Sequence, residues 1–592
     1  MNDPLNPQSN ESQRRLMTAL ALSFAVIAAW QLFGPKPPAP TPGATSATAT
    51  ADAGTAAPAA TAAVPAPGTG AQVAAPSADA PPVRTVERAR ETARYRFSSE
   101  GAGLTFAELE GPKMREQQNT SVREGFGLLF GTHKIDAPQM NLAHPVAGEP
   151  LPFSVSITGA QPFPAQTRYA VQEDAGGNGV TFVGRSGPWE LTKRLTWPKE
   201  GFELSYVVTV KNVSAQPQQG ELVMHHNRAI DPEFEHAPSF FGGVGNQSLP
   251  TCFVGDDAHD LHPGKEFKPA DGVGKVAYFG INQQYFLSAL YPTGGARDGR
   301  CVLSATADKR TVEVAFPLSV APGQEVQLPF GAYLGPKDPD LLKAVGLGVA
   351  GAAGSVHPPL EKTINLGLWA VIANLLLIIL KFFHGIAGNW GVAIILLTVL
   401  VKLVLLPLTH KSMVAMEGMK KLQPRMDEIR KKYASDRERQ NLEMMKLYQE
   451  GKVNPLGGCL PMLIQMPVWI ALFTALRNSF DIYWEPFVGP VWRDLTYKDP
   501  TYLLPLALGV TMIITQKLQP QMMDAAQARI MTWVVPIVFT FSLMQYPAGL
   551  SLYIFTNNLL TIVQQWGLKR WIARRAPALE PATAVSAGGK RK

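Results

Sequence analysis

Five long apolar runs in the last third of the chain constrain its fold more than any other feature. They span residues 390–408, 456–476, 502–518, 530–546 and 549–567. Each run is close in length to the ~20-residue helix that crosses a bilayer. Prolines interrupt three of the runs, and such prolines are tolerated where neighbouring helices satisfy the freed backbone groups. The sequence therefore predicts a polytopic α-helical membrane protein.

A sixth apolar run, residues 16–33, follows Arg14 and Arg15 near the N-terminus. Its ~18 residues are just enough to cross the hydrocarbon core, and the arginines favour a cytoplasmic segment at 1–15. A cleaved signal peptide is the competing interpretation, although its apolar core is usually shorter. We expect an uncleaved anchor, followed at 34–82 by a disordered tether of Ala, Pro, Thr and Gly.

Residues 83–342 change to a hydrophobic period of two. In the stretches FELSYVVTVKN and RTVEVAFPL, apolar residues alternate with mostly polar ones. This pattern predicts antiparallel sheets packed as an all-β sandwich. His225 and His226 would point to opposite faces of a strand, so we expect them to form hydrogen bonds rather than chelate a metal. Cys252 and Cys301 could form a disulfide outside the cytoplasm, but their spacing leaves this open.

Residues 343–389 contain a further apolar run, 364–380, that either crosses the membrane or lies flat on its surface. The loop after the next run, 409–455, is rich in Lys and Arg and belongs in the cytoplasm. If the run at 364–380 crossed the bilayer, that loop would lie outside. We therefore expect 364–380 to form an interfacial amphipathic helix.

Six transmembrane helices then place the remaining segments. The loop 477–501, with Trp484 and Trp492 as interface aromatics, lies outside the cytoplasm together with the sandwich domain. The loop 519–529 and the basic tail 568–592 lie inside. Both termini are therefore expected in the cytoplasm.

Lys402 lies inside the run 390–408, where a charged residue costs a few kcal/mol. Thr398 precedes it by one turn on the same helix face. On the last run a polar stripe is formed at spacings of three and four by Tyr553, Asn557, Thr561 and Gln564. Polar faces on two helices predict a shared hydrated cavity that contains a cation. The alternatives are a lysine that snorkels to the headgroups and a stripe that only links packed helices.

The cytoplasmic loop is expected to form two charged helices joined near residues 434–436. Their apolar stripe is rich in methionine: Met416, Met419, Met426 and Met445. These methionines either pack the two helices together or form an adaptable surface for apolar segments of other proteins. The lysines between them could face lipid headgroups or RNA, although the loop contains no RNA-binding motif.

Several short motifs resemble those of the YidC family of membrane-protein insertases. They are NWG at Asn389, PLT at Pro407, LQP at Leu422, VNPLGGC at Val453 and YPAGLSLY ending at Tyr553. This resemblance covers residues 362–570. QQYF at Gln283 and the KNVS region resemble, more weakly, the large periplasmic domain of Gram-negative members. The resemblance implies five helices of a family core, and insertion and folding of nascent proteins in the bacterial inner membrane, alone or with the Sec translocon.

In this family a groove open to cytoplasm and lipid contains a positive residue, and its position corresponds to Lys402. Many members carry arginine there. Lysine keeps the charge without the planar fork of donors, which favours a mechanism that needs only positive potential. Some members carry two consecutive tyrosines on the last helix, and only Tyr553 matches here because Ile554 follows it. The resemblance implies the lipid bilayer as a partner, with the ribosome and signal-recognition components as candidates through the hairpin and basic tail.

Two other functions compete with insertion. A solute transporter would use Lys402 in an intramembrane anion site, but transporters usually contain internal repeats and none is found here. An intramembrane protease needs a paired nucleophile and base, and Ser542 and Ser551 lack both GxSxG and a nearby membrane histidine. We therefore expect no catalytic residues. The three cysteines form no CxxC pair, so no thiolate metal site is expected, and insertion needs no cofactor.

Overall fold

The computed structural model describes residues 81–575 apart from 118–119, 133–135, 175, 198–200, 231–246, 347–356, 452–459, 490 and 519–527. The expected cytoplasmic N-terminus, the first transmembrane helix and nearly all of the tether lie outside these residues. So do the VNPLGGC motif, most of the loop 519–529 and the end of the basic tail.

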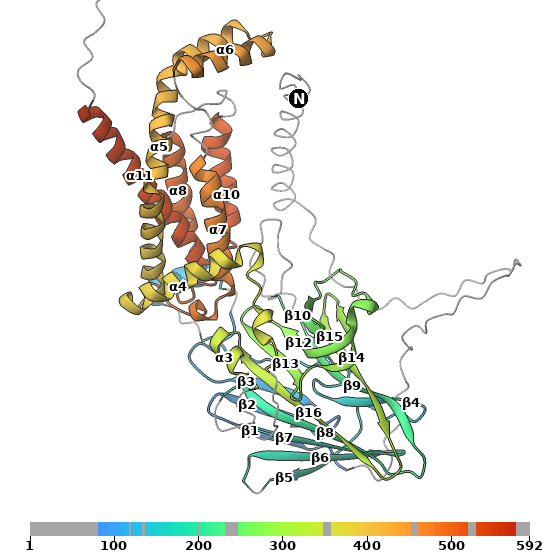
Figure 1. Ribbon diagram of the computed structural model, residues 1–592. Coiled ribbons are helices and arrows are strands. Elements are labelled where there is room, and N and C mark those ends of the chain that lie inside the picture. The colour runs from blue at the N-terminus through green and yellow to red at the C-terminus, as the bar shows by residue number, and fades with distance from the viewer. Residues whose placement is uncertain are drawn as a thin grey trace, which may run out of the picture. The chain divides into compact units, whose positions relative to one another are not determined.

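Strands fill the first half of the described chain and helices fill the second (Figure 1). The strands are β1 (Thr85–Ala89), β2 (Ala93–Ser98), β3 (Leu104–Leu109), β4 (Val155–Gly159), β5 (Ala170–Glu173), β6 (Gly179–Ser186), β7 (Trp189–Thr196), β8 (Glu203–Asn212), β9 (Gln218–Ala229), β10 (Leu249–Val254), β11 (Asp257–Asp260), β12 (Val273–Asn282), β13 (Phe286–Pro292), β14 (Arg297–Ala305), β15 (Lys309–Val320) and β16 (Glu325–Pro336). The helices are α2 (Val122–Leu129), α3 (Pro339–Ala344), α4 (Ala370–Ala387), α5 (Trp390–Lys432), α6 (Arg437–Glu450), α7 (Leu460–Asn478), α8 (Leu503–Leu518), α10 (Val535–Leu543) and α11 (Ala548–Arg575). Short helical turns are η1 (Pro269–Gly272), η2 (Leu360–Thr363), η3 (Gly367–Trp369), η5 (Phe480–Ile482) and the π-helical η6 (Ile530–Val534).

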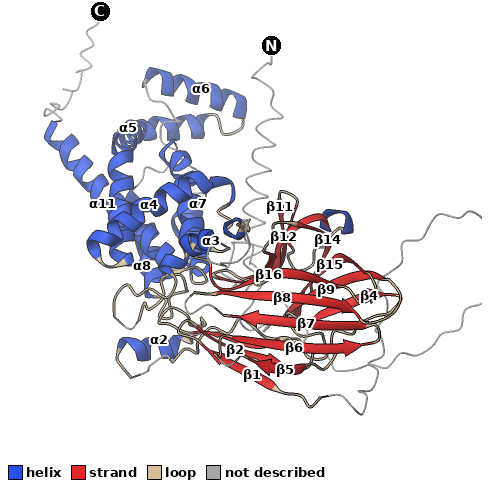
Figure 2. Cartoon of the chain, turned by 60° about the horizontal axis from the view of Figure 1, so that its bottom comes forward, coloured by secondary structure: helices blue, strands red, loops and turns tan. Residues whose placement is uncertain are grey.

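The strands form one small sheet and one large sheet. The small sheet has the order β1-β2-β3, and the large one follows the path β4-β9-β15-β14-β12-β13-β16-β8-β7-β6-β5, with β10 and β11 attached through β12. Phe316 on β15 and Phe330 on β16 belong to strands that are not neighbours, yet their ring centroids lie 5.6 Å apart. The large sheet therefore curls back over a shared core, as a sandwich requires (Figure 2).

Alternation along the strands decides which side chains enter this core. On β8 the buried positions are Leu204, Tyr206, Val208 and Val210, as the period of two predicts. Cys252 on β10 and Cys301 on β14 are also buried, and a disulfide joins them. Both strands pair with β12, so the covalent bond connects two strands that are already held by the same neighbour.

The two adjacent histidines of β9 point to opposite faces and have separate partners. His225 Nε2 lies 2.8 Å from Ser156 Oγ, and His226 Nε2 lies 2.8 Å from Ser288 Oγ. Burial lowers the pKa of His226 to about 4, which keeps this ring neutral at neutral pH. Both contacts are structural hydrogen bonds of the sheet.

The helical part of the chain is built around the expected apolar runs. In the described residues, the stretches Gly367–Ala387 and Trp390–Lys432 are long and apolar enough to cross a membrane, while Leu503–Leu518 and Ile530–Leu543 are shorter apolar helices. The first stretch contains α4, whose axis runs across those of α5 and α11 in Figure 1 instead of beside them. The interfacial position of α4 stays a prediction.

The predicted span 390–408 and the first hairpin helix form one continuous helix. The helix α5 runs through Pro407 and Pro424 to Lys432. A proline removes only one backbone donor, so a long helix with good neighbours can bend and continue. The turn before α6 lies where it was expected, because the Asp436 carboxylate accepts a hydrogen bond from the Arg439 amide, 3.0 Å away, and caps α6.

The helices pack unevenly along the bundle. We call the end next to residues 479–502 the loop end and the end next to α6 the hairpin end. Fully buried side chains gather towards the loop end: Ala393, Ile394, Leu397, Ala471, Leu472, Leu476, Leu508 and Leu550. Towards the hairpin end the apolar side chains of the same helices are exposed: Leu403, Val404, Leu406, Met466, Leu559 and Val563.

Candidate functional site

The polar stripe of α11 contacts α5 and α7 towards the hairpin end of the bundle. Lys402 Nζ on α5 donates a hydrogen bond to Thr561 Oγ1, 2.8 Å away. The Lys402 side chain is half-buried, and among the described residues no carboxylate lies within 4.0 Å of its ammonium group. A lysine ammonium has three donors, so Lys402 can bind further acceptors.

Two more hydrogen bonds flank this contact along α11. Gln564 Nε2 donates to Thr409 Oγ1 on α5, and the atoms lie 2.8 Å apart. Gln465 Nε2 on α7 donates to Asn557 Oδ1 over 2.7 Å. The stripe is therefore shared by three helices, with Lys402 between its two amide contacts.

Four of the six predicted groove residues come together in this way, and two do not. Thr398 is buried, and its hydroxyl donates to the Ile394 carbonyl of its own helix, 2.6 Å away. Tyr553 is also buried, and its hydroxyl lies beside the side chain of Gln465, the partner of Asn557. Thr398 therefore bonds only within its own helix, whereas Tyr553 lies at the edge of the polar contacts.

Sequence reasoning missed two members of the site, Gln465 and Thr409. Both are polar residues inside or at the edge of apolar runs, LPMLIQMPV and LLPLTH. The expectation that polar groups in a bilayer face protein or water would have found them if it had been applied to every run.

The methionines of the hairpin divide between packing and exposure. Met419 and Met426 are buried, and Met416 is half-buried, whereas Met445 on α6 is exposed. Gln440 Nε2 on α6 donates to the Arg430 carbonyl of α5 over 3.1 Å and helps to hold the two helices together. The methionines of α5 thus have the packing environment of the first interpretation, and Met445 has the accessibility that the second requires.

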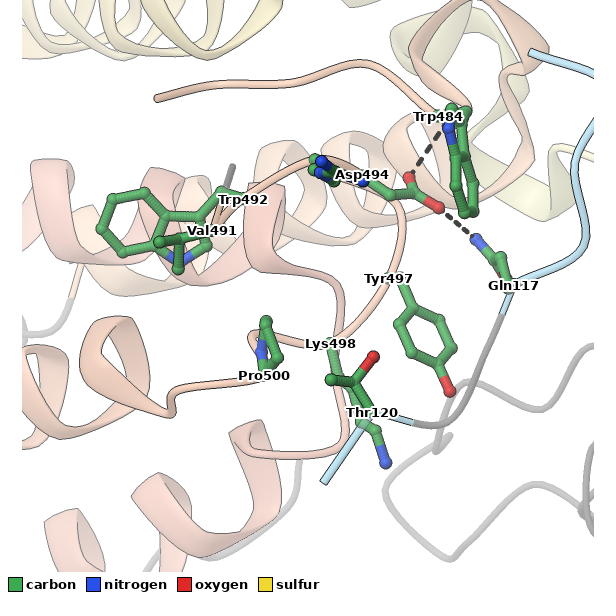
Figure 3. Close-up of a pocket in the computed structure, with 10 residues that line it drawn as sticks. Gln117, Thr120, Trp484, Val491, Trp492, Asp494, Tyr497, Lys498 and Pro500 are labelled. Carbon is green, nitrogen blue, oxygen red and sulfur yellow. Dashed lines mark hydrogen bonds between the residues drawn. The ribbon is translucent and has the colours of Figure 1, made fainter. Parts of the chain in front are cut away.

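A small cavity lies away from these residues, where the loop at 479–502 meets a segment of the β domain (Figure 3). Its volume is about 40 Å³, enough for water. Asp494 in its wall accepts hydrogen bonds from Gln117 Nε2 at 2.7 Å and from the Trp484 amide at 3.2 Å. Burial raises the pKa of the Asp494 carboxyl, while these hydrogen bonds oppose the shift. The cavity is lined by residues of both domains, and none of the predicted groove residues lines it.

In the described part of the chain, no group of three or more His, Cys, Asp or Glu side chains is arranged to hold a metal ion. The polar contacts around Lys402 are instead made by hydroxyls, amides and its own ammonium. Such groups can bind carboxylates and backbone carbonyls by hydrogen bonds and by charge.

Comparisons with known proteins cover both domains. A family model described as 60Kd inner membrane protein matches residues 382–575, and one described as YidC periplasmic domain matches 132–379. The chain is 37% identical over 566 residues to a membrane protein insertase YidC of Anaeromyxobacter dehalogenans (strain 2CP-C), covering 93% of this chain and 96% of that relative. It is 42% identical over 320 residues to a YidC of Geobacter sulfurreducens, covering 54% and 57% of the two chains. A crystal structure of an active YidC insertase shares 18% identity, with a TM-score of 0.35 and coverage of 82% and 94%.

Proposed function

The chain belongs to the YidC family of membrane protein insertases, and we propose that it inserts membrane proteins through a hydrated, positively charged groove at the hairpin end of its bundle. Membership makes it a bacterial inner-membrane protein with a periplasmic domain. Its relatives are named insertases, which suggests that it is not an enzyme. The observation that carries the groove is the hydrogen bond from Lys402 on α5 to Thr561 on α11.

That bond favours a groove lysine over a snorkelling one. It directs the ammonium to the polar stripe of the neighbouring helix, although headgroups lie within partial reach of so long a side chain. With no carboxylate of the described residues within 4.0 Å, its charge remains available to an incoming acidic or polar segment. In a partly buried site this attraction is stronger than in bulk water.

The uneven packing of the bundle supports the next step of the proposed mechanism, in which the apolar helix of the substrate moves into lipid. The closely packed loop end would stop the polar segment, while water at the hairpin end would shorten the apolar distance that it has to travel. The apolar helix that follows would then move into lipid beside exposed residues such as Leu403, Val404 and Val563. Burial of apolar surface, worth about 25 cal/mol per Å², supplies the free energy without a cofactor.

The topology in this proposal has six spans and cytoplasmic termini. The helices α5, α7, α8, η6 with α10, and α11 are five of the spans, and α4 lies at the interface. The hairpin of α5 and α6 and the basic tail then face the cytoplasm, where a ribosome or signal-recognition components bring substrates. The Sec translocon is a proposed partner for substrates with large translocated domains.

The test is insertion by the full chain reconstituted in liposomes. A small, newly made membrane protein with an acidic leading tail is added, and its protease-protected fraction is measured for the native chain, Lys402→Ala and Lys420→Ala. Lys420 is an exposed lysine further along the same helix and therefore a matched control. We expect Lys402→Ala to lose most insertion and Lys420→Ala to keep it.

Two results would contradict the proposal in different ways. Equal insertion by the native chain and Lys402→Ala would leave an insertase in which Lys402 has no electrostatic role. Failure of every variant, the native chain included, would argue against autonomous insertion. Anion uptake by the same vesicles, abolished in Lys402→Ala, would then favour a transporter.

A further inference from the structure

A segment of the β domain, described at residues 111–117 and 120–130, follows the loop at the end of the bundle. Lys113 Nζ lies 2.6 Å from a carboxylate oxygen of Glu485, and Gln117 Nε2 donates to Asp494 over 2.7 Å. Further along both chains, Gly125 packs against Pro500, because a Cβ on Gly125 would lie only 2.4 Å from the Pro500 carbonyl oxygen. The segment and the loop therefore run in the same direction, towards the start of α8.

The last part of this segment is the short helix α2. It begins with a capping box, in which Ser121 Oγ accepts from the Glu124 amide and the Glu124 carboxylate accepts from the Ser121 amide, 2.8 Å away. Gly125 and Leu128 are buried. The helix is thus held by its own cap and by close backbone contact with Pro500.

The opposite face of α2 is apolar and exposed. Its side chains recur at helical spacing, with exposed fractions of 42% for Val122, 39% for Phe126, 43% for Leu129 and 73% for Phe130, the C-cap residue. Arg123, also exposed, flanks this face. Large apolar side chains clustered on one face of a surface helix mark a site of interaction.

The position of α2 identifies what covers this face. Pro500 precedes the first residue of α8, Leu503, by three residues, and α8 is one of the proposed spans. The interfacial helix α4 is tied to the same loop, because Lys381 Nζ forms an ion pair with Asp481 over 2.8 Å. Its outer face is apolar and exposed as well, at Val371, Leu375, Ile378, Phe382 and Ile386. The apolar faces of α2 and α4 thus both belong to helices fixed to the loop from which α8 enters the bilayer.

We propose that α2 is a second membrane contact of the β domain, with Phe126, Leu129 and Phe130 inserted at the periplasmic surface of the bilayer. This rests on the proposed topology, in which α8 crosses the membrane and the loop 477–501 lies outside. A helix with aromatic and leucine side chains on one face and a cation beside it suits the boundary between headgroups and acyl chains. Arg123 would then contact lipid phosphate.

The test uses the full chain in vesicles and measures which quencher reaches a fluorophore on α2. With Cys459 replaced by Ser, a single cysteine is introduced as Phe130→Cys or, in a second variant, Leu129→Cys, and is labelled with an environment-sensitive dye. Quenching is compared for lipids with a nitroxide near the headgroup and for aqueous iodide. Val213→Cys is the aqueous control, because Val213 is a half-exposed residue after β8, and Val404→Cys, on the exposed face of α5, is the lipid control.

We expect the nitroxide lipids to quench positions 129 and 130 at least about threefold more than position 213, with the reverse order for iodide. Iodide quenching equal to that of position 213 would overturn the proposal in favour of an exposed face. Shielding from both quenchers would overturn it in favour of a covering protein segment. If position 404 is not quenched by lipid, the topology itself fails, and the proposal fails with it. Loss of insertion in liposomes alone would count against the proposed function only.

Discussion

The β domain and the helical bundle each contain a lysine that is at least partly buried, and the surroundings of the two lysines differ. In the β domain, Lys193 on β7 is fully buried, and its ammonium donates to three backbone carbonyls. These belong to Gly101, Ala102 and Phe153, at 3.0, 2.7 and 2.8 Å. In the bundle, Lys402 is half-buried and donates to one hydroxyl.

The difference separates a lysine whose donors are all used by the protein from one with donors still available to a ligand, as the proposed groove requires. A lysine whose three N–H donors all bind carbonyls of the protein connects strands and loops, and it has no donor left for a ligand. A lysine with one neutral partner in a polar, partly open site keeps both its charge and its hydrogen-bonding capacity. Burial alone therefore does not separate the two lysines, and the proposed criterion is the number of donors that the protein itself satisfies.

The largest predicted effect is the loss of stability on replacing the fully buried lysine, Lys193. We expect Lys193→Met to lower the unfolding free energy of the β domain by about 3–5 kcal/mol, because it leaves buried carbonyls without donors. Hydrogen exchange of the β7 and β8 amides in the full chain measures this change. Lys211→Met, a half-exposed lysine on β8, is the control. A loss below about 1 kcal/mol, or one no larger than that of Lys402→Met, would remove the distinction.

The next effect tests the charge of the open lysine. We expect Lys402→Glu to lower the insertion rate of a substrate with an acidic leading tail by about tenfold or more, because attraction becomes repulsion. Lys402→Arg should retain most of the rate, since a positive potential is sufficient. The liposome assay compares both variants with a substrate whose leading tail is neutral. Equal rates for Glu and Arg would show that charge at this position is irrelevant.

A third lysine sharpens the comparison through pH. Lys337, after β16, is buried and donates to Asn282 Oδ1 at 2.8 Å and to the Gln283 carbonyl at 3.1 Å. Burial lowers its pKa to about 8, whereas an unfolded lysine titrates near ~10.4. Between these values the unfolded state binds more protons, so the unfolding free energy of the β domain should rise with pH, by about 1 kcal/mol from pH 8 to 9.

The variant Lys337→Met should lack this rise, while titration of other groups affects both proteins alike. Unfolding of the full chain, followed by hydrogen exchange at β13 and β16, gives the two pH profiles. Parallel profiles would mean that Lys337 keeps an ordinary pKa and that its two acceptors compensate for burial.

The sequence carried much of this architecture because helix and strand periodicity is local. Several features can be recognised without knowing any tertiary contact. They are the alternation of β8 and β15, the spacing of Asn557, Thr561 and Gln564, and the position of Lys402 among apolar residues. The alternation of WELTKRLT would also place Lys193 at an inward position of a strand, between Leu191 and Leu195, although Lys193 was not singled out from the sequence. Its three carbonyl partners could not be predicted, because they come from segments ~40–90 residues away.

The bundle shows the same limit. Sequence spacing placed Tyr553 on the polar stripe of α11, where it lies beside Gln465, but it did not show that neighbouring helices bury this side chain. It also gave no sign that Gln465 on α7 meets Asn557, because which helix faces which is a property of tertiary packing. The disulfide between Cys252 and Cys301 was undecided for the same reason, since it depends on both strands pairing with β12.

The smallest predicted effect concerns the contact between α7 and α11. We expect the coupling free energy between Gln465→Leu and Asn557→Leu to be about 0.6 kcal/mol, the value typical of hydrogen bonds between transmembrane helices, which α7 and α11 are in the proposed topology. A double-mutant cycle on unfolding of the reconstituted chain measures it. The control pair is Gln465→Leu with Thr474→Val, because the Thr474 hydroxyl donates to the Ile470 carbonyl of its own helix. That pair should be additive.

A coupling energy near zero would mean that water replaces this hydrogen bond easily, as an open, hydrated hairpin end allows. A value above about 2 kcal/mol would instead make the Gln465–Asn557 contact part of a rigid core. Lys402 would then lie in a closed site like that of Lys193, and the groove would need a helix movement before a substrate could reach the ammonium. The size of this one coupling therefore decides whether the two lysines differ in kind or only in the number of their partners.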